Sequence, residues 1–150
     1  MRPSLTPRVS SQALILLVDD NQDGVIARRS VLEELGYRIV TAGCGSDALR
    51  IATEHKFDLV ITDYRMSPMD GLELISNLRA SGFEGPIILL SGFAEKLGLL
   101  PESTGANVVI QKSHNEVANL IRHTKRLLSP KKPAGSHTAR AKAASRTGTN

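Results

Sequence analysis

The stretch FDLVITD, residues 57–63, decides the fold that we expect of this chain. Six mostly apolar residues follow one another without polar alternation, and they lead to the carboxylate of Asp63. Such a run is typical of a strand that is buried on both faces, as in a parallel sheet covered by helices. Residues 71–80 then repeat leucine and isoleucine at helical spacing and stop before Gly82. The segment therefore predicts a buried strand followed by a helix that packs on it.

Apolar runs and helical patterns alternate in the same way over residues 13–128. This alternation predicts an α/β fold, a three-layer sandwich around a five-stranded parallel sheet, or (βα)5. The predicted strands are residues 13–18, 37–41, 57–62, 86–90 and 107–110. The predicted helices are residues 22–35, 46–55, 71–80, 94–100 and 114–128, of which the fourth is short and ends before Pro101.

Apolar side chains show which helix faces should point toward the sheet. In the first helix these are Val25, Leu32 and Leu35, and Gly36 follows as the glycine that ends the helix. In the last helix the inward positions are predicted to be Val117, Leu120, Ile121, Thr124 and Leu128.

The composition fits one folded domain between two polar ends. Of the 150 residues, 41% are hydrophobic and 23% are charged, which excludes wholesale disorder. We predict a flexible arm over residues 1–12, a folded domain over 13–128 and a disordered basic tail over 129–150, which has too little apolar surface to form a core. The longest apolar run is too short to span a bilayer, and the first dozen residues lack the core of a signal peptide. We therefore expect a cytoplasmic protein without membrane contact.

The net charge of +4 comes from the two ends of the chain. Residues 13–128 hold 12 basic and 15 acidic side chains, whereas the tail holds five basic residues and no acid. A basic tail can contact phosphate backbones nonspecifically, but no nucleic-acid-binding motif accompanies it, and only 3% of the residues are aromatic. We expect no nucleic-acid partner and interpret the tail as a solubilising segment.

Polar side chains follow four of the five predicted strands. Because the carboxyl ends of parallel strands meet at one edge of a sheet, and ligands of such sheets bind there, we expect these side chains to converge. Three clustered carboxylates repel one another unless a cation lies between them, and Mg²⁺ is the hard cation that carboxylates, water and phosphoryl oxygens share. An ammonium and a hydroxyl would hold the remaining phosphoryl oxygens. The residues are Asp19 and Asp20 after the first strand, Asp63 after the third, Ser91 after the fourth and Lys112 after the fifth.

Each of these residues also has a simpler interpretation. An aspartate after a strand commonly caps a helix, and an isolated lysine is commonly a solvated surface group. Ser91 before Gly92 fits an ordinary turn. The coincidence of the right residue type at four strand ends favours phosphoryl chemistry, with Asp63 as a carboxylate nucleophile beside a metal ion.

Four motifs at these strand ends resemble those of the response-regulator receiver domain, the CheY-like module of two-component signalling. They are LVDDN at residues 17–21, DYRMSPMDGLEL at 63–74, LSG at 90–92 and IQK at 110–112. The resemblance covers about residues 13–128 and implies a flavodoxin-like fold with strand order 2-1-3-4-5.

The resemblance also implies a role for each matching residue. Asp63 resembles the phosphoacceptor, Ser91 the switch hydroxyl and Lys112 the lysine that pairs with the phosphoryl group. Mg²⁺, for which Mn²⁺ can substitute, would be held by Asp20 and Asp63 directly, by Asp19 mainly through water, and by the backbone carbonyl of Arg65. The phosphodonor would be a sensor histidine kinase or a histidine phosphotransfer protein.

Three positions depart from the family pattern. Ser113 follows the lysine where proline is usual, and Val109 stands where the family has the aromatic residue that moves with the switch hydroxyl. The fourth helix is interrupted by Pro101. The expected function is a stand-alone phosphoacceptor receiver, not a dedicated enzyme, whose phosphorylation switches contacts with an unknown target. Those contacts, or a dimer, would use residues 94–100, 107–110 and 114–128. The alternative is a non-switching docking module or phosphate sink.

Two enzyme classes compete with this interpretation. Gly43, Gly45 and Ala48 match the G-x-G-x-x-A dinucleotide fingerprint, although such a fingerprint normally follows the first strand. The simpler interpretation of this segment is a glycine turn, with Ser46 capping the next helix. A haloacid-dehalogenase-type phosphatase also uses Asp, Ser or Thr, Lys and Mg²⁺, but its nucleophile follows the first strand in a D-x-D motif, which this chain lacks. Cys44 lies in the same turn and is expected to be inert.

Overall fold

The structure is a computed structural model that describes residues 13–130. Five strands form one parallel sheet in the order β2-β1-β3-β4-β5, as the resemblance implied. The strands are β1 (Leu14–Val18), β2 (Arg38–Ala42), β3 (Leu59–Asp63), β4 (Ile87–Ser91) and β5 (Val108–Gln111). The helices are α1 (Gln22–Glu34), α2 (Gly45–Glu54), α3 (Gly71–Ala80), α4 (Ala94–Leu97), α5 (Pro101–Thr104) and α6 (Glu116–Leu128).

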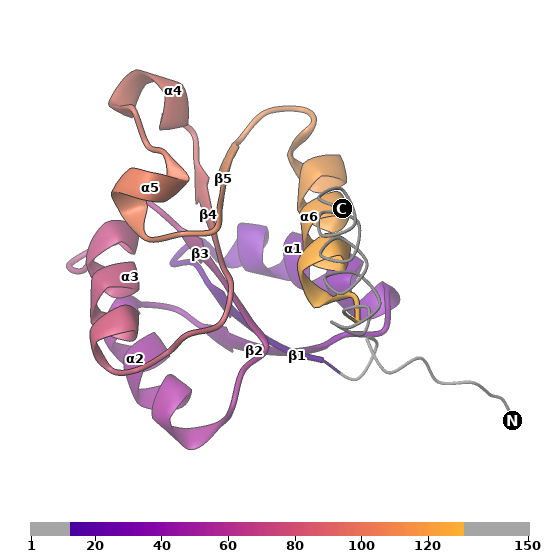
Figure 1. Ribbon diagram of the computed structural model, residues 1–150. Helices are drawn as coiled ribbons and strands as arrows, with labels where there is room; N and C mark the ends of the chain where they lie inside the picture. The colour runs from indigo at the N-terminus through magenta and orange to yellow at the C-terminus, as the bar shows by residue number, and fades with distance from the viewer. Residues whose placement is uncertain (1–12, 131–150) are drawn as a thin grey trace, which may run out of the picture.

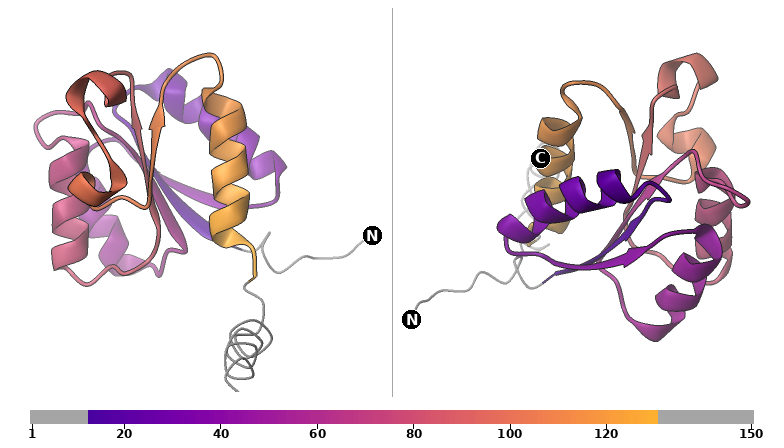
Figure 2. Two further views of the ribbon diagram at one scale, coloured as in Figure 1. Left: turned by 45° about the horizontal axis from the view of Figure 1, so that its top comes forward. Right: turned by 180° about the vertical axis from the view of Figure 1, so that it is seen from behind.

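The three predicted layers are present. Helices α1 and α6 cover one face of the sheet, and α2, α3 and α5 cover the other (Figures 1 and 2). The pleat of β1 divides its side chains between two cores: Ile15 and Leu17 face α1 and α6, and Leu16 and Val18 face the opposite layer. All five residues of β3 are buried, as expected of the central strand of such a sheet.

Local signals begin and end the helices near the predicted positions. Asn21 caps α1 by accepting a hydrogen bond from the Gly24 amide, and Gly36 follows the helix with a φ of 99°. Asp70 caps α3 in a reciprocal capping box with Glu73. These caps fix where the loops at the carboxyl edge of the sheet become helices.

One glycine brings α3 close to the end of β3. A Cβ atom added at Gly71 would lie 2.5 Å from the carbonyl oxygen of Asp63 and 2.9 Å from the Cα of Tyr64. The Gly71 amide donates a hydrogen bond of 2.8 Å to the carbonyl of Tyr64. The loop therefore folds back tightly on Asp63, and only glycine leaves room for this approach.

The connection between β4 and β5 differs from the prediction of one short helix. It holds two single-turn helices, because α4 ends at Gly98 in the left-handed conformation (φ 65°) and Pro101 then begins α5 at its first position. The last helix also begins later than predicted, at Glu116, and Val117 is 46% exposed rather than inward-facing. Its other predicted inward positions are buried or half-buried.

The predicted arm (residues 1–12) and all but the first two residues of the predicted tail (129–150) lie outside the described residues. Within residues 13–130, no helix is long and apolar enough to cross a membrane.

Candidate functional site

A cleft of about 400 Å³ opens at the carboxyl edge of the sheet, where the sequence predicted a site. It contains five of the six predicted site residues; Ser91 is the exception. The lining residues are Asp19, Asp20, Asn21, Gly24, Arg28, Asp63, Arg65 and Lys112.

Asp63 is one of two buried acids in the cleft. It is the last residue of β3 and is 4% exposed. Burial raises the pKa of this carboxyl above its ordinary value, and this effect outweighs the opposing influence of Lys112. The Lys112 ammonium forms an ion pair with Oδ1 of Asp63, and no geometrically regular hydrogen bond within residues 13–130 reaches that oxygen. The carboxylate therefore has capacity for a further ligand.

Lys112 and Asp63 come from strands that are not neighbours in the sheet. Lys112 directly follows β5, and its amide donates to the carbonyl of Ser91 at 2.8 Å, which continues the β4–β5 ladder by one step. The side chain is partly exposed and reaches across β4 to Asp63. Because the lysine side chain is flexible, its ammonium can move to contact the oxygen of a group that becomes attached to the Asp63 carboxylate.

Asp19 is held on both sides. Its Oδ1 accepts a hydrogen bond from the Asn21 amide at 2.9 Å, and its Oδ2 accepts one from Arg28 Nη1 at 2.6 Å. Asp20, in contrast, is exposed and has no ion pair among the residues that the structure describes. The predicted acidic pair is therefore unequal: one carboxylate is buried and already neutralised, and the other is free for an incoming cation.

Ser91 lies beside the cleft rather than in it. As the last residue of β4 it is next to Asp63, which pairs in register with Leu90. The Ser91 side chain is buried, and its hydroxyl accepts a hydrogen bond from the Phe93 amide at 3.0 Å. Within residues 13–130, no hydrogen bond joins this hydroxyl to Asp63 or Lys112. The structure therefore places the predicted switch residue next to the site without bringing its oxygen into it.

Arg65 lines the cleft and contacts the loop after β4. It follows Asp63 by two residues, and its guanidinium lies 5.1 Å from the centre of the Phe93 ring. This contact joins the loop after β3 to the loop after β4. The predicted contribution of the Arg65 carbonyl to a metal site is compatible with its place in the cleft lining.

The sequence analysis missed two charged side chains: Arg28, which lines the cleft, and Glu116, which contacts Arg28. Arg28 is 8% exposed, and besides Asp19 it contacts Glu116 of α6, with 2.6 Å between Nε and Oε2. Burial alone would lower the pKa of Arg28, but the hydrogen bonds and negative charges of these two acids raise it above its ordinary value. A signal was available, because Arg28 lies three residues after Val25 and four before Leu32, on the apolar stripe of α1.

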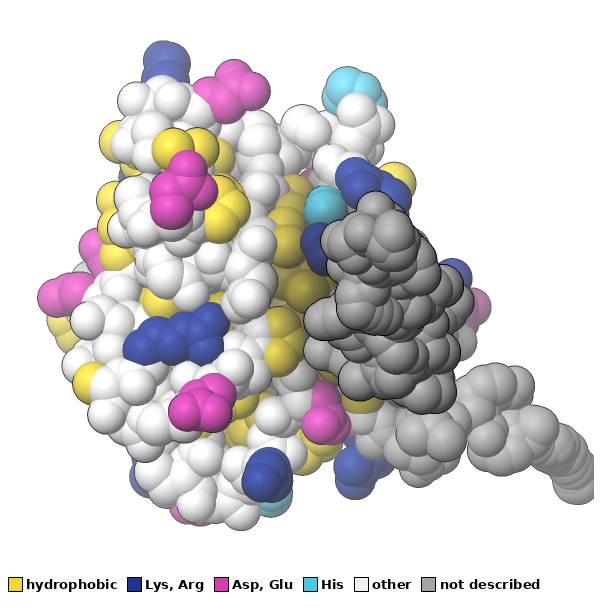
Figure 3. Space-filling view, viewed as in Figure 1, with side chains coloured by type: hydrophobic (Ala, Val, Ile, Leu, Met, Phe, Trp, Pro, Cys, Tyr) yellow, Lys and Arg dark blue, Asp and Glu magenta, His cyan; other side chains and the backbone are white. Residues whose placement is uncertain are grey.

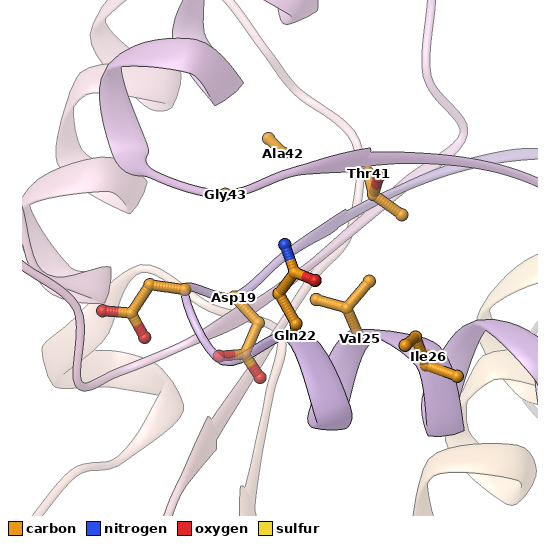
Figure 4. A pocket seen from close by; sticks show the side chains of 8 residues that line it. Asp19, Gln22, Val25, Ile26, Thr41, Ala42 and Gly43 are labelled. Atoms are coloured by element: carbon orange, nitrogen blue, oxygen red, sulfur yellow. The ribbon is translucent and has the colours of Figure 1, made fainter.

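A second pocket of about 380 Å³ adjoins the cleft and shares Asp19 and Asp20 with it. In Figure 4, Gln22, Val25 and Ile26 project from α1 toward the end of β2, where Thr41 lies. The remaining residues that line this second pocket are Ala42 and Gly43, and Gly43 begins the segment that matched a dinucleotide fingerprint.

One glycine of that segment, Gly45, has a packing role. A Cβ atom at Gly45 would lie 2.6 Å from the sulfur of Met69, so this glycine lets α2 approach the loop after β3. The helix begins at Gly45 with Cys44 as its cap residue, so the prediction that Ser46 is the cap was wrong; Ser46 lies inside the first turn. The segment follows the edge strand β2, and a dinucleotide fingerprint belongs after the first strand.

The model of the response regulator receiver domain matches residues 15–124.

The chain belongs to this family.

The related sequences are longer proteins that this chain matches over part of their length. The virulence sensor protein BvgS of Bordetella bronchiseptica is 38% identical over 91 residues, which is 58% of this chain and 7% of that protein. The transcriptional regulatory protein GlrR of Escherichia coli is 35% identical over 94 residues, or 63% of this chain and 20% of that protein. KdpE of Mycobacterium tuberculosis is 38% identical over 78 residues, which is 52% of this chain and 34% of that protein. This chain thus matches only a part of each curated relative.

Solved receiver structures show the same fold. TrrA of Thermotoga maritima, in complex with Mg²⁺ and beryllium fluoride, has a TM-score of 0.70 and 32% identity, and the match covers 78% of this chain and 100% of that one. The receiver of the sensor histidine kinase PA1611 of Pseudomonas aeruginosa holds a magnesium ion in its active-site cleft, with a TM-score of 0.70, 29% identity, and coverage of 78% and 98%. CheY4 of Vibrio cholerae has a TM-score of 0.70, 28% identity, and coverage of 78% and 99%.

The donor set of this receiver fits magnesium better than a softer metal. Three carboxylates line the cleft, and Mg²⁺ is usually bound through one or two carboxylates while it keeps several waters. Within residues 13–130, no three acid, histidine or cysteine side chains form a ready-made metal cage.

Proposed function

We propose that this receiver accepts a phosphoryl group on Asp63 from the phosphohistidine of a sensor histidine kinase or a histidine phosphotransfer protein. The observation that carries the proposal is the Asp63 carboxylate itself. It is buried at the carboxyl end of β3 and ion-paired to Lys112, and it lies in a cleft that two further acids line. In the transfer, a carboxylate oxygen of Asp63 forms the new bond to phosphorus while the bond from phosphorus to the histidine nitrogen breaks.

The side chains around Asp63 have separate tasks in this reaction. Once a carboxylate oxygen of Asp63 carries the phosphoryl group as an acyl phosphate, the Lys112 ammonium would stabilise a phosphoryl oxygen, because an ammonium is a strong donor to anionic oxygen. Asp20, Asp63 and the Arg65 carbonyl would hold Mg²⁺ (or Mn²⁺ in its place), with Asp19 acting through water. When bound, the ion neutralises the negative charge of the phosphoryl group and the acids around it.

The response to phosphorylation is proposed to begin at Ser91. Its hydroxyl would leave the Phe93 amide and turn toward the phosphoryl group, which would shift the loop that leads into α4. Val109 is half-buried on β5 and offers no ring to follow that movement. The switch would therefore act through the β4–α4 loop, where Phe93 itself is exposed and in contact with Arg65.

The proposed contact surface consists of α4, α5, β5 and the adjoining side of α6. Hydrophobic side chains gather over α4 and α5 on the face seen in Figure 3, and Phe93, Leu97 and Leu100 are each about half exposed. This surface would bind the downstream target or a second copy of the chain. The cytoplasm, where such kinases deliver their phosphoryl groups, is the proposed location.

A docking module or phosphate sink is the second candidate. It is favoured by the absence of an aromatic ring at Val109 and by the division of the expected fourth helix into α4 and α5. In that case Asp63 would still take up phosphate, but the surface over α4 and α5 would not change.

The proposal is tested by intact-mass spectrometry after incubation with Mg²⁺ and acetyl phosphate. The protein should gain the mass of one phosphoryl group, and the gain should vanish without Mg²⁺ and in Asp63→Asn. Asp47→Asn is the matched control, because Asp47 is an exposed acid of α2 away from the cleft, and it should be labelled fully. Full labelling of Asp63→Asn would overturn the assignment of the phosphoacceptor.

A further inference from the structure

Arg28 is a buried charged side chain for which the proposed function has no task. It lies on the sheet-facing side of α1, and its guanidinium bridges two acids that are far apart in the sequence. Nη1 donates to Asp19 Oδ2 and Nε donates to Glu116 Oε2, both at 2.6 Å. Short, charge-assisted bonds at a site this enclosed are strong, and each acid loses much of its free negative charge to the guanidinium.

This arrangement puts a fixed cation inside a site that is proposed to bind a mobile one. Arg28 and Asp19 both line the cleft that holds Asp63. A divalent ion that draws on Asp19 must share its oxygens with the guanidinium, and two cations close together in a partly buried cleft repel each other. Asp20, by contrast, is exposed and unpaired within the described residues. Arg28 and a bound divalent ion would therefore compete for the carboxylate of Asp19.

Glu116 gives the guanidinium a second anchor. It belongs to the first turn of α6, and its side chain is largely buried against Arg28. When a metal ion takes over the charge of Asp19, Arg28 keeps a carboxylate partner and need not become a buried unpaired charge, which would be costly. The strength of the contact between α1 and α6 should then depend on whether the cleft holds an ion.

We propose that Arg28 competes with Mg²⁺ for Asp19, and so weakens magnesium binding, and that it transmits the presence of the ion to the first turn of α6 through Glu116. This inference rests on the proposed function, because it concerns the metal site of the same cleft. It adds a residue that sets the affinity of that site and a direct contact from it to α6.

The first test is calorimetric titration of the whole chain with MgCl₂, without a phosphodonor. Arg28→Gln removes the charge but keeps a polar side chain, and it should bind Mg²⁺ at least about ten-fold more tightly, or about 1.4 kcal/mol. Glu116→Gln leaves the full charge of Arg28 to Asp19 and should bind Mg²⁺ more weakly than the unmodified chain. Arg29→Gln is the matched control: Arg29 is the next residue of α1 and pairs with Glu33 on the surface, so its loss should change the affinity by less than about two-fold.

The second test uses the unmodified chain and does not depend on the folding of a variant. The side-chain Nε–H of Arg28 and the amide of Glu116 should both shift in ¹⁵N NMR spectra as Mg²⁺ is added, whereas the Nε–H of Arg29 should stay in place. Arg28→Lys keeps the charge but not the two-armed bridge. It should retain a magnesium affinity close to that of the unmodified chain and lose the shift at Glu116.

The outcomes separate this inference from the proposed function. Equal magnesium affinity in the unmodified chain and Arg28→Gln, with a lower urea midpoint for the variant, would show a purely structural arginine and overturn the inference alone. Magnesium binding by Arg28→Gln but not by the unmodified chain would support the competition and contradict the proposed phosphoacceptor function. No binding by either protein would overturn both.

Discussion

At the scale of single residues, the site contains the Asp63 carboxylate in a buried position that disfavours its charged form. The pKa of Asp63 is raised above its ordinary value because the side chain is desolvated, even though Lys112 and Arg28 favour the charged form. A poorly solvated carboxylate beside a cationic donor is well prepared for nucleophilic attack on phosphorus.

Gly71 controls how closely the backbone approaches Asp63. Gly71→Ala would place a methyl group 2.5 Å from the Asp63 carbonyl oxygen, so the loop must move. We expect a loss of roughly 1–3 kcal/mol in the free energy of unfolding, measured by urea titration, together with slower labelling by acetyl phosphate.

Gly43→Ala is the control for this prediction, because no atom lies within 4 Å of a Cβ added there. It should be neutral in both measurements. Loss of labelling in Gly43→Ala, with normal labelling in Gly71→Ala, would show that the glycine segment after β2, and not the loop after β3, shapes the site.

At the scale of elements, α6 has a face that the pattern of apolar residues did not describe. Its predicted inward position Val117 is exposed, and Glu116 turns inward to Arg28 instead. The first turn of α6 therefore contacts the site through Glu116, while Leu120 and Thr124 are buried in the core. The strip of apolar residues located the helix correctly but not the rotation of its first turn.

His123 makes α6 sensitive to pH. Partial burial and the neighbouring Arg122 and Arg126 lower its pKa, and its Nδ1 accepts a hydrogen bond from Arg126 at 2.8 Å. A histidine whose pKa is lower in the folded chain than in the unfolded chain resists protonation, so the stability that it contributes is lost as the pH falls below about 6.5. His123→Gln should flatten the fall of the urea midpoint between neutral and mildly acidic pH.

The control for this prediction is His55→Gln, which replaces an exposed histidine just after α2 and shows how far a His-to-Gln change on the surface alters the urea midpoint. An unaltered pH profile in His123→Gln would contradict the assignment.

At the scale of the whole molecule, the site and the proposed contact surface adjoin each other through the loop after β4. Ser91 ends β4 and Phe93 lies in that loop, and the half-exposed Leu97 of α4 and Leu100 just before α5 follow it. A change at Asp63 thus has a short path to the surface.

Leu97→Ser tests whether this surface binds another copy of the chain. If it does, the unmodified chain should self-associate more strongly after acetyl phosphate is added, as measured by sedimentation velocity. Leu97→Ser should lose most of this gain, because a half-exposed leucine at the centre of a contact contributes apolar area that serine lacks. Its labelling at Asp63 should be unchanged.

Ile26→Ser is the matched control, because Ile26 is the most exposed large hydrophobic side chain among the described residues but lies on α1. It should self-associate normally. Equal loss in both variants would indicate nonspecific association, and no gain in the unmodified chain would favour the docking or phosphate-sink alternative.

The sequence by itself determined the layered α/β fold and most of the cleft. Long apolar strands and caps such as Asn21 and Asp70 are local signals, and strands in a parallel sheet must end at one edge. Asp19, Asp20, Asp63 and Lys112 could therefore be placed together before any coordinates. The strand order came from the resemblance to a family and not from the pattern of residues.

Only the tertiary structure decided which side chains meet. Arg28 and Glu116 are 88 positions apart, and no local rule links them. The direction of the Ser91 hydroxyl, the division of α4 from α5 and the outward turn of Val117 depend in the same way on packing between elements. Burial and long-range contact are properties of the folded chain, so they fix the charge balance of the site, whereas periodicity and capping are properties of short segments and fix only where the site lies.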